Sequence, residues 1–169
     1  MLLFRLFTVS VLISMLGACG FQPLYYQDGE RVSIRSDMRS VFIEPIEDRI
    51  GQELRINLKT TLNPTGANAE KKWNLKIVLT ESTQKIALES TSFSTRANLI
   101  VTARVDLSSS ISGSELSFSG KSKTISSYNI VDSDYADIVA ERDAQSRAVV
   151  SLSNDIRRQL ALWLRGVEG

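Results

Sequence analysis

Residues 99–107 contain the longest regular pattern in the chain. Their odd positions are apolar and their even positions, apart from Ile100, are polar, so in a β-strand the two kinds of side chain fall on opposite faces. Residues 73–80 alternate in the same way, with Val78 as the one apolar residue at an even position. Strands with one apolar face must bury it against another layer, which restricts the chain to a layered fold.

Two segments with a helical period can supply that layer. In residues 47–62, Ile50, Leu54, Leu58 and Leu62 recur every four positions, which predicts one apolar face on a helix. A longer helix is expected from about Tyr135 to Leu164, with Asp134 as its cap. The residues expected on its buried side are Ile138, Val149, Leu152, Ile156, Leu160 and Trp163.

Shorter signals complete the order of elements. Residues 41–43 form a β-branched and aromatic strand that Pro45 closes, and residues 112–114 predict a hairpin turn before a return strand. The apolar residues that follow the alternation of residues 73–80, Ile86 and Leu88, fall on even instead of odd positions. This shift predicts either a bulge between Thr80 and Lys85 or a separate strand. The return strand also loses its phase near Gly120.

The order is therefore strand, helix, three or more strands, helix. It predicts an α+β two-layer sandwich, in which an antiparallel or mixed four-stranded sheet carries both helices on one face. The chain has 169 residues, of which 43% are hydrophobic and 23% are charged. These values are typical of one ordinary folded domain.

Composition excludes several classes of function. The chain has no histidine, which removes the commonest general base, the Ser–His and Cys–His pairs and every imidazole metal ligand. The net charge of +1 argues against a wholly basic, nucleic-acid-binding surface. We expect no enzymatic activity, no metal and no cofactor. A carboxylate hydrolase is the enzymatic alternative, but a helix start explains the only dense acidic cluster, which is Asp132, Asp134, Asp137 and Glu141.

The amino terminus has the features of an export signal. Arg5 precedes an apolar run at residues 6–16. This run is too short to cross a bilayer as a helix, which needs about 20 residues. Residues 16–19, Leu-Gly-Ala-Cys, resemble a bacterial lipobox. The resemblance implies that Cys19 is diacylated and becomes the first residue, and Gly20 implies sorting to the outer membrane. Two alternatives stay open: Cys19 is only a small residue near a cleavage site, or the segment is an uncleaved anchor.

These observations predict three parts in the chain. Residues 1–18 are a lipoprotein signal peptide, residues 19–39 are the lipidated cysteine and an extended tether, and residues 40–169 are a single α+β domain. Cys19 is the only cysteine, so its lipidation leaves no thiol for a disulfide or a metal site. The domain must then be stabilised by packing alone.

Three features together resemble a known family. They are the order of elements, the sequence Cys-Gly-Phe-Gln-Pro-Leu-Tyr at residues 19–25, and Tyr135-Ala136 followed by Val-Ala-Glu-Arg-Asp-Ala at residues 139–144. Over essentially the whole mature chain, the sequence resembles the lipopolysaccharide (LPS)-assembly lipoprotein LptE family in its alphaproteobacterial form.

The resemblance implies a function. Members are outer-membrane lipoproteins that plug the LPS-export β-barrel LptD, aid its assembly, bind LPS and help to insert it into the outer leaflet. The expected partners are thus an LptD-like barrel, LPS and, through the lipid, the membrane, but no nucleic acid. The expected location is the outer membrane, with the domain in the barrel lumen or facing the periplasm. The rival interpretation is a scaffolding lipoprotein of another envelope complex that does not bind LPS.

The strands carry polar faces that would suit the polar wall of a barrel, although ordinary solvent-facing strands have the same composition. These residues are Asn98, Thr102, Arg104, Asp106, Ser117, Ser119, Lys121 and Lys123.

Candidate LPS-binding residues follow from charge. LPS carries phosphates and carboxylates, so a binder needs lysine or arginine within reach of them. Lys121 and Lys123 share a face, beside a glycine, Gly120, that would let another molecule approach closely. Arg104 on the preceding strand and Arg142 in the last helix are the other candidates. A lysine pair on a strand is also a common means of protecting a sheet edge, which leaves a purely structural role open.

Overall fold

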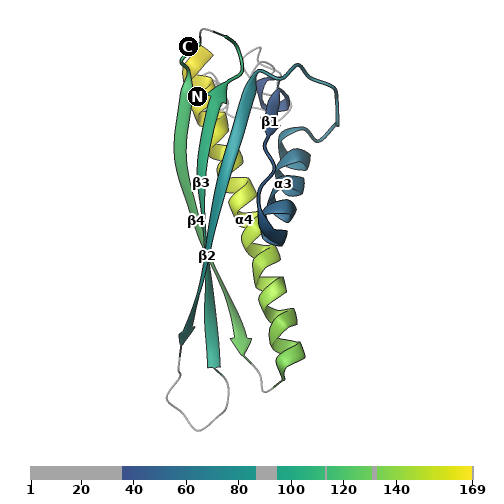
Figure 1. Cartoon of the computed structure of the whole chain (residues 1–169), viewed down its shortest axis with the longest axis vertical. Coiled ribbons are helices and arrows are strands. Elements are labelled where there is room, and N and C mark those ends of the chain that lie inside the picture. Colours follow the sequence, from purple (N-terminus) through teal and green to yellow (C-terminus); the bar gives the residue numbers. More distant parts are fainter. Residues whose placement is uncertain (1–35, 87–94, 113, 131–132, 169) are drawn as a thin grey trace, which may run out of the picture.

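The computed structural model describes residues 36–86, 95–112, 114–130 and 133–168 (Figure 1). Cys19 and most of the predicted tether lie outside these ranges, and residues 36–39 form one helical turn. The elements are, in order, β1 (Val41–Ile43), α3 (Asp48–Leu62), β2 (Trp73–Ile86), β3 (Thr95–Ser109), β4 (Ser117–Ile130) and α4 (Asp134–Glu168). None of the described helices is long and apolar enough to cross a membrane.

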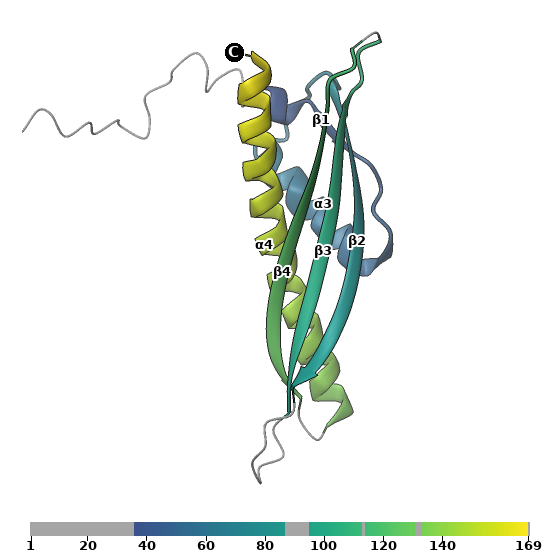
Figure 2. The same cartoon turned by 90° about the vertical axis from the view of Figure 1, so that its left-hand side faces the viewer.

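The strands form one mixed sheet in the order β1-β2-β3-β4. β1 runs parallel to β2, whereas β2, β3 and β4 are antiparallel neighbours. Both helices lie on the same side of this twisted sheet, and α4 runs along its length (Figures 1 and 2). The prediction of an α+β two-layer sandwich with a mixed sheet is confirmed.

The core fills the space between the sheet and the two helices. α3 contributes the predicted row of Ile50, Leu54, Leu58 and Leu62. Gly51 is buried beside this row, and a Cβ there would lie 2.7 Å from Cγ2 of Ile46, so only glycine lets the chain fold back this closely. The sheet and α4 contribute the larger share, led by Leu75, Leu99, Val101, Val105, Leu107, Val149, Leu152, Ile156, Leu160 and Leu164.

The phase shift in the first long strand is not a bulge. β2 is continuous, and each residue from Trp73 to Ile86 pairs with one residue of β3. Ile86 is out of phase because it lies on the opposite face from Trp73, at the end of the strand beyond the core. The prediction of a bulge or a separate strand was therefore wrong. Apolar side chains follow the buried face only where a helix covers it.

The apparent break in the return strand has a different cause. β4 pairs without interruption with β3, and its even positions face the helices. Two of these positions are the buried serines Ser122 and Ser126. Gly120 faces α4 as well, because a Cβ there would lie 2.6 Å from Oε1 of Gln159. This glycine therefore serves helix packing rather than the predicted approach of another molecule.

The start of α4 also differs from the prediction. The N–H of Asp137 donates to the Ser133 carbonyl, so Ser133, and not Asp134, flanks the helix. Ile138 is 50% exposed, because the residues of α4 before Ala144 do not belong to the core. Trp163 is only partly buried at the other end of the helix, where it packs against the core.

Candidate functional site

One face of the sheet is free of helices in the described part of the chain (Figure 2). The cross-strand pairs place even positions of β2 and β3 and odd positions of β4 on this open face. All eight residues that the sequence suggested for a polar strand face lie here. The open face is mainly polar, but it also presents two exposed aliphatic side chains, Val78 and Ile125.

Three predicted binding residues meet on the open face. Arg104 lies directly opposite Lys121, and Lys123 is the next residue of β4 on the same face, opposite Thr102. We call Arg104, Lys121 and Lys123 the cation cluster. All three cations are exposed, whereas Thr102 is partly buried. None of the three cations forms a salt bridge with a described residue.

The nearest acidic residue to Arg104 on β3, Asp106, already accepts a hydrogen bond. Asp106 accepts a hydrogen bond of 2.6 Å from the hydroxyl of Ser119 and lies opposite Lys76 in the sheet. Like charges directly across a strand pair are destabilising, and Arg104 and Lys121 are such a pair. An anion placed between their side chains would remove this repulsion.

A small hollow lies next to the cation cluster. It has a volume of about 230 Å³ and is lined by Val78, Thr80, Thr102, Arg104 and Lys121. Its lining combines two cations, two hydroxyls and one aliphatic side chain, all from the three long strands. Such a lining suits an anionic group attached to an apolar chain better than a purely polar ion.

Residues beneath the cluster hold its strand in place. Between Lys121 and Lys123, Ser122 points to the helix side and its hydroxyl donates to a carboxylate oxygen of Asp155 on α4, at 2.5 Å. The amide of Gln159 donates to the Lys121 carbonyl at 3.3 Å and to Asp155 at 2.9 Å. Hydrogen bonds to Asp155, first from Ser122, hold the pKa of this carboxyl below its ordinary value.

Sequence reasoning did not find Asp155 and Gln159, which position the cation cluster from below. Both lie among charged residues near the middle of a long helix, where a solvated face is the usual interpretation. The only signal was the small polar residue Ser122 at a helix-facing position of β4, and this position is recognisable only once the strand register is known.

The fourth predicted residue lies elsewhere. Arg142 is exposed on α4, on the helix side of the sheet, and so it does not join the cation cluster. Asp134, Asp137 and Glu141 follow one another along the first turns of the same helix, and Asp132 lies outside the described residues. In the described ranges no group of three or more acidic or cysteine side chains is placed to hold a metal ion.

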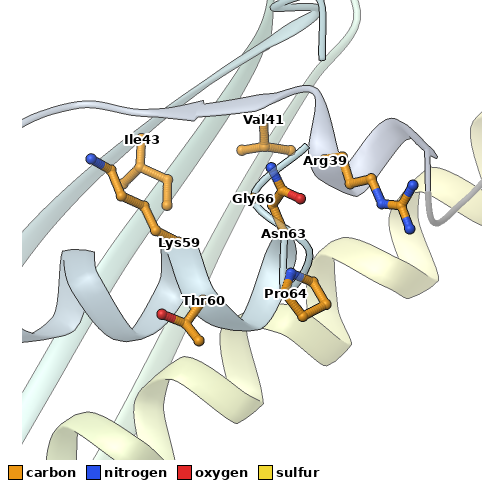
Figure 3. Close-up of a pocket in the computed structure, with 8 residues that line it drawn as sticks. All are labelled: Arg39, Val41, Ile43, Lys59, Thr60, Asn63, Pro64 and Gly66. Atoms are coloured by element: carbon orange, nitrogen blue, oxygen red, sulfur yellow. The ribbon is translucent and has the colours of Figure 1, made fainter. Parts of the chain in front are cut away.

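A larger groove lies between β1 and the end of α3 (Figure 3). It has a volume of about 500 Å³ and is lined by Arg39, Val41, Ile43, Lys59, Thr60, Asn63, Pro64 and Gly66. Nε of Arg39 is buried without a hydrogen-bond partner among the described residues. The guanidinium of Arg39 points away from Lys59, with Asn63 between them (Figure 3). The two cations therefore do not converge on one small anion as those of the cation cluster can.

Comparison with known proteins bears on the fold. No protein-family model and no curated protein matches the chain. A candidate lipoprotein from Caulobacter crescentus CB15 is similar in structure, with a TM-score of 0.63 and 24% identity over 79% of this chain and 96% of that one. A minor lipoprotein from Acinetobacter baumannii has a TM-score of 0.54 and 17% identity, over 72% of this chain and 91% of that one. The chain thus shares the fold of two proteins described as lipoproteins.

Proposed function

We propose that this protein is a lipid-anchored, non-catalytic lipoprotein of the outer membrane. In this proposal Cys19 carries the lipid, and the domain partners and plugs an LptD-like export barrel, aids its assembly and helps to deliver LPS to the outer leaflet. Three findings support the proposal: the lipobox-like sequence at residues 16–19, the fold shared with two lipoproteins, and a long polar sheet face that no described helix covers (Figure 2). More than one acyl chain makes such anchoring stable.

The observation that carries LPS binding is the pair of like charges at Arg104 and Lys121. Two cations held opposite each other, with Lys123 beside them and no salt bridge to a described acid, repel one another until an anion is bound. The phosphates of LPS supply that anion, and the exposed Val78 and Ile125 can contact the apolar part of the same molecule. Arg142 lies apart on α4 and would have to contact LPS separately.

The first experiment identifies the partner. The natively lipidated, tagged protein is purified from outer membranes in mild detergent, and the proteins that co-elute in fixed ratio are identified. We expect a single large β-barrel at one to one. A different stoichiometric partner, or none, would contradict the plug and favour a general envelope scaffold.

The second experiment tests the cation cluster by LPS retention on the same lipidated protein. Lys121→Gln should weaken LPS binding about tenfold, since one charge-assisted contact is lost, and Lys121→Gln with Lys123→Gln should weaken it further. Arg157→Gln removes an exposed cation of α4 and is the matched control. Arg142→Gln tests the separate fourth residue. Equal LPS binding by the control and the double variant would exclude the cluster as the binding site.

A further inference from the structure

The first turns of α4 present three large apolar side chains to solvent. Tyr135 is 79% exposed, Ile138 is 50% exposed and Val139 is 47% exposed. Their spacing of three and four residues places them together on one face of the helix. Contiguous exposed apolar surface on a soluble domain is typical of an interaction site. We call these three residues the α4-start surface.

Other exposed apolar residues of the helix stand alone. Val150 is 50% exposed, the same fraction as Ile138. However, its neighbours three and four positions away on the helix are all polar, namely Ser146, Arg147, Ser153 and Asn154. Single exposed apolar residues are normal and need no explanation. Val150 is therefore a matched reference for the α4-start surface, which is a cluster.

Acidic residues run along the same turns. Asp134, Asp137 and Glu141 have the spacing of one helix face and lie beside the apolar cluster. The negative charge of Asp137 and Glu141 acts on Tyr128 of the neighbouring strand β4. Burial raises the pKa of the Tyr128 phenol, and the carboxylates of Glu141 and Asp137 raise it further. The same turns also carry the exposed Arg142, and Asp143 is paired with Arg147. The three carboxylates against the one arginine still leave this end of α4 with a net negative charge, unlike the cation cluster on the other side of the sheet.

This combination selects the kind of ligand. An anionic lipid surface would be repelled by the carboxylates, whereas a polypeptide that presents apolar side chains together with lysine or arginine would be attracted. We infer that the α4-start surface docks such a cationic, apolar segment of a partner protein. The inference rests on the proposed function in one respect, namely that the partner protein is the export barrel. It assigns the contact with the barrel to the start of α4 rather than to the open face of the sheet.

The experiment uses the full lipidated chain in its own host. A photo-crosslinking residue is placed at position 138 or, as the control, at position 150. In parallel, Ile138→Asp and Val150→Asp are compared for the amount of barrel that co-purifies. Both substituted side chains are equally exposed, so neither change disturbs the core. We expect position 138 to crosslink to the barrel and Ile138→Asp to reduce its recovery about tenfold, with no effect at position 150.

The outcomes separate this inference from the proposed function. If the wild type and Ile138→Asp co-purify with equal amounts of a barrel, the inferred docking surface is wrong, but the proposed function as a barrel plug is retained. If no barrel is found but position 138 crosslinks to an apolar segment rich in lysine or arginine in another, identified protein, the surface stands and the plug is wrong. A crosslink to a segment without these side chains would overturn the inference. Crosslinking to lipid alone, or equal crosslinking at positions 138 and 150, would overturn the inference.

Discussion

Ser122 on β4 donates a hydrogen bond of 2.5 Å to Asp155 on α4. The contact joins the outermost long strand to the long helix directly beneath the two lysines of the cation cluster. Asp155 also accepts hydrogen bonds from Arg158 and Gln159, both at 2.9 Å, so it organises a small polar network between the layers. This network stabilises the layers most while the carboxylate is charged, because hydrogen bonds to a charged acceptor are stronger than those to a neutral one.

The Asp155 network should make stability depend on pH. Hydrogen bonds lower the pKa of Asp155 in the folded protein below its ordinary value of 3.8. The network therefore stabilises the fold fully above about pH 4 and progressively less as the pH falls through the folded pKa. Urea unfolding of the wild type should show stability falling as the pH is lowered below about 4.

Asp155→Asn removes the charge and is the comparison for that experiment. It should lower the free energy of unfolding at pH 7. It should also remove the part of the pH dependence of stability below about pH 4 that comes from Asp155. Ser122→Ala should cost about 1 kcal/mol at pH 7, because Asp155 keeps its other two donors. An Asp155→Asn variant with the same acid dependence as the wild type would contradict the assignment.

The like-charge pair of the cation cluster should lower the stability of the protein without its ligand. Lys121→Gln removes the repulsion with Arg104 and should stabilise the fold by about 0.5 kcal/mol at low salt, with a smaller gain at high salt. Lys123→Gln is the control, because Lys123 lies opposite the uncharged Thr102. Equal effects of the two substitutions on urea unfolding would show that the pair carries no repulsion.

A side chain at position 120 should destabilise the protein. A Cβ there would lie 2.6 Å from Gln159 Oε1 and 2.7 Å from Phe118 Cζ, so Gly120→Ala should destabilise the protein by about 1–3 kcal/mol. Gly166→Ala places the same methyl where no atom lies within 4 Å, and it should leave thermal stability unchanged or slightly raised. If Gly120→Ala left the melting temperature unchanged while weakening LPS binding, the glycine would serve ligand approach instead.

Trp163 should join the end of α4 to the sheet. Its ring packs edge-on against Trp73 at 5.2 Å between centroids and lies 6.0 Å from Phe118. Trp163→Ala should cost about 2 kcal/mol and change the near-ultraviolet circular dichroism of the remaining tryptophan. Leu162→Ala, at a neighbouring position that is 69% exposed, is the control and should have little effect on either measurement. Similar losses from both substitutions would contradict a specific role of the ring pair.

The candidate site was predictable in part. Alternation places Lys121 and Lys123 on one face from sequence alone, since the period of a strand is two. The position of Arg104 opposite Lys121 depends on the pairing of β3 with β4, which no local pattern contains. The helix-facing role of Gly120 and the support from Asp155 likewise depend on where α4 crosses the sheet.

The sequence by itself determined the elements, their order and the layered α+β architecture, because periods of two and of about four residues specify which face of each element must be buried. Only the tertiary structure decided how far that burial extends. α4 and the strands continue past the core at one end, so Ile138 is exposed and Ile86 is out of phase there. Where α4 approaches β4 closely, small and polar residues replace large apolar ones, because close contact leaves room only for glycine and serine and for hydrogen bonds between the layers.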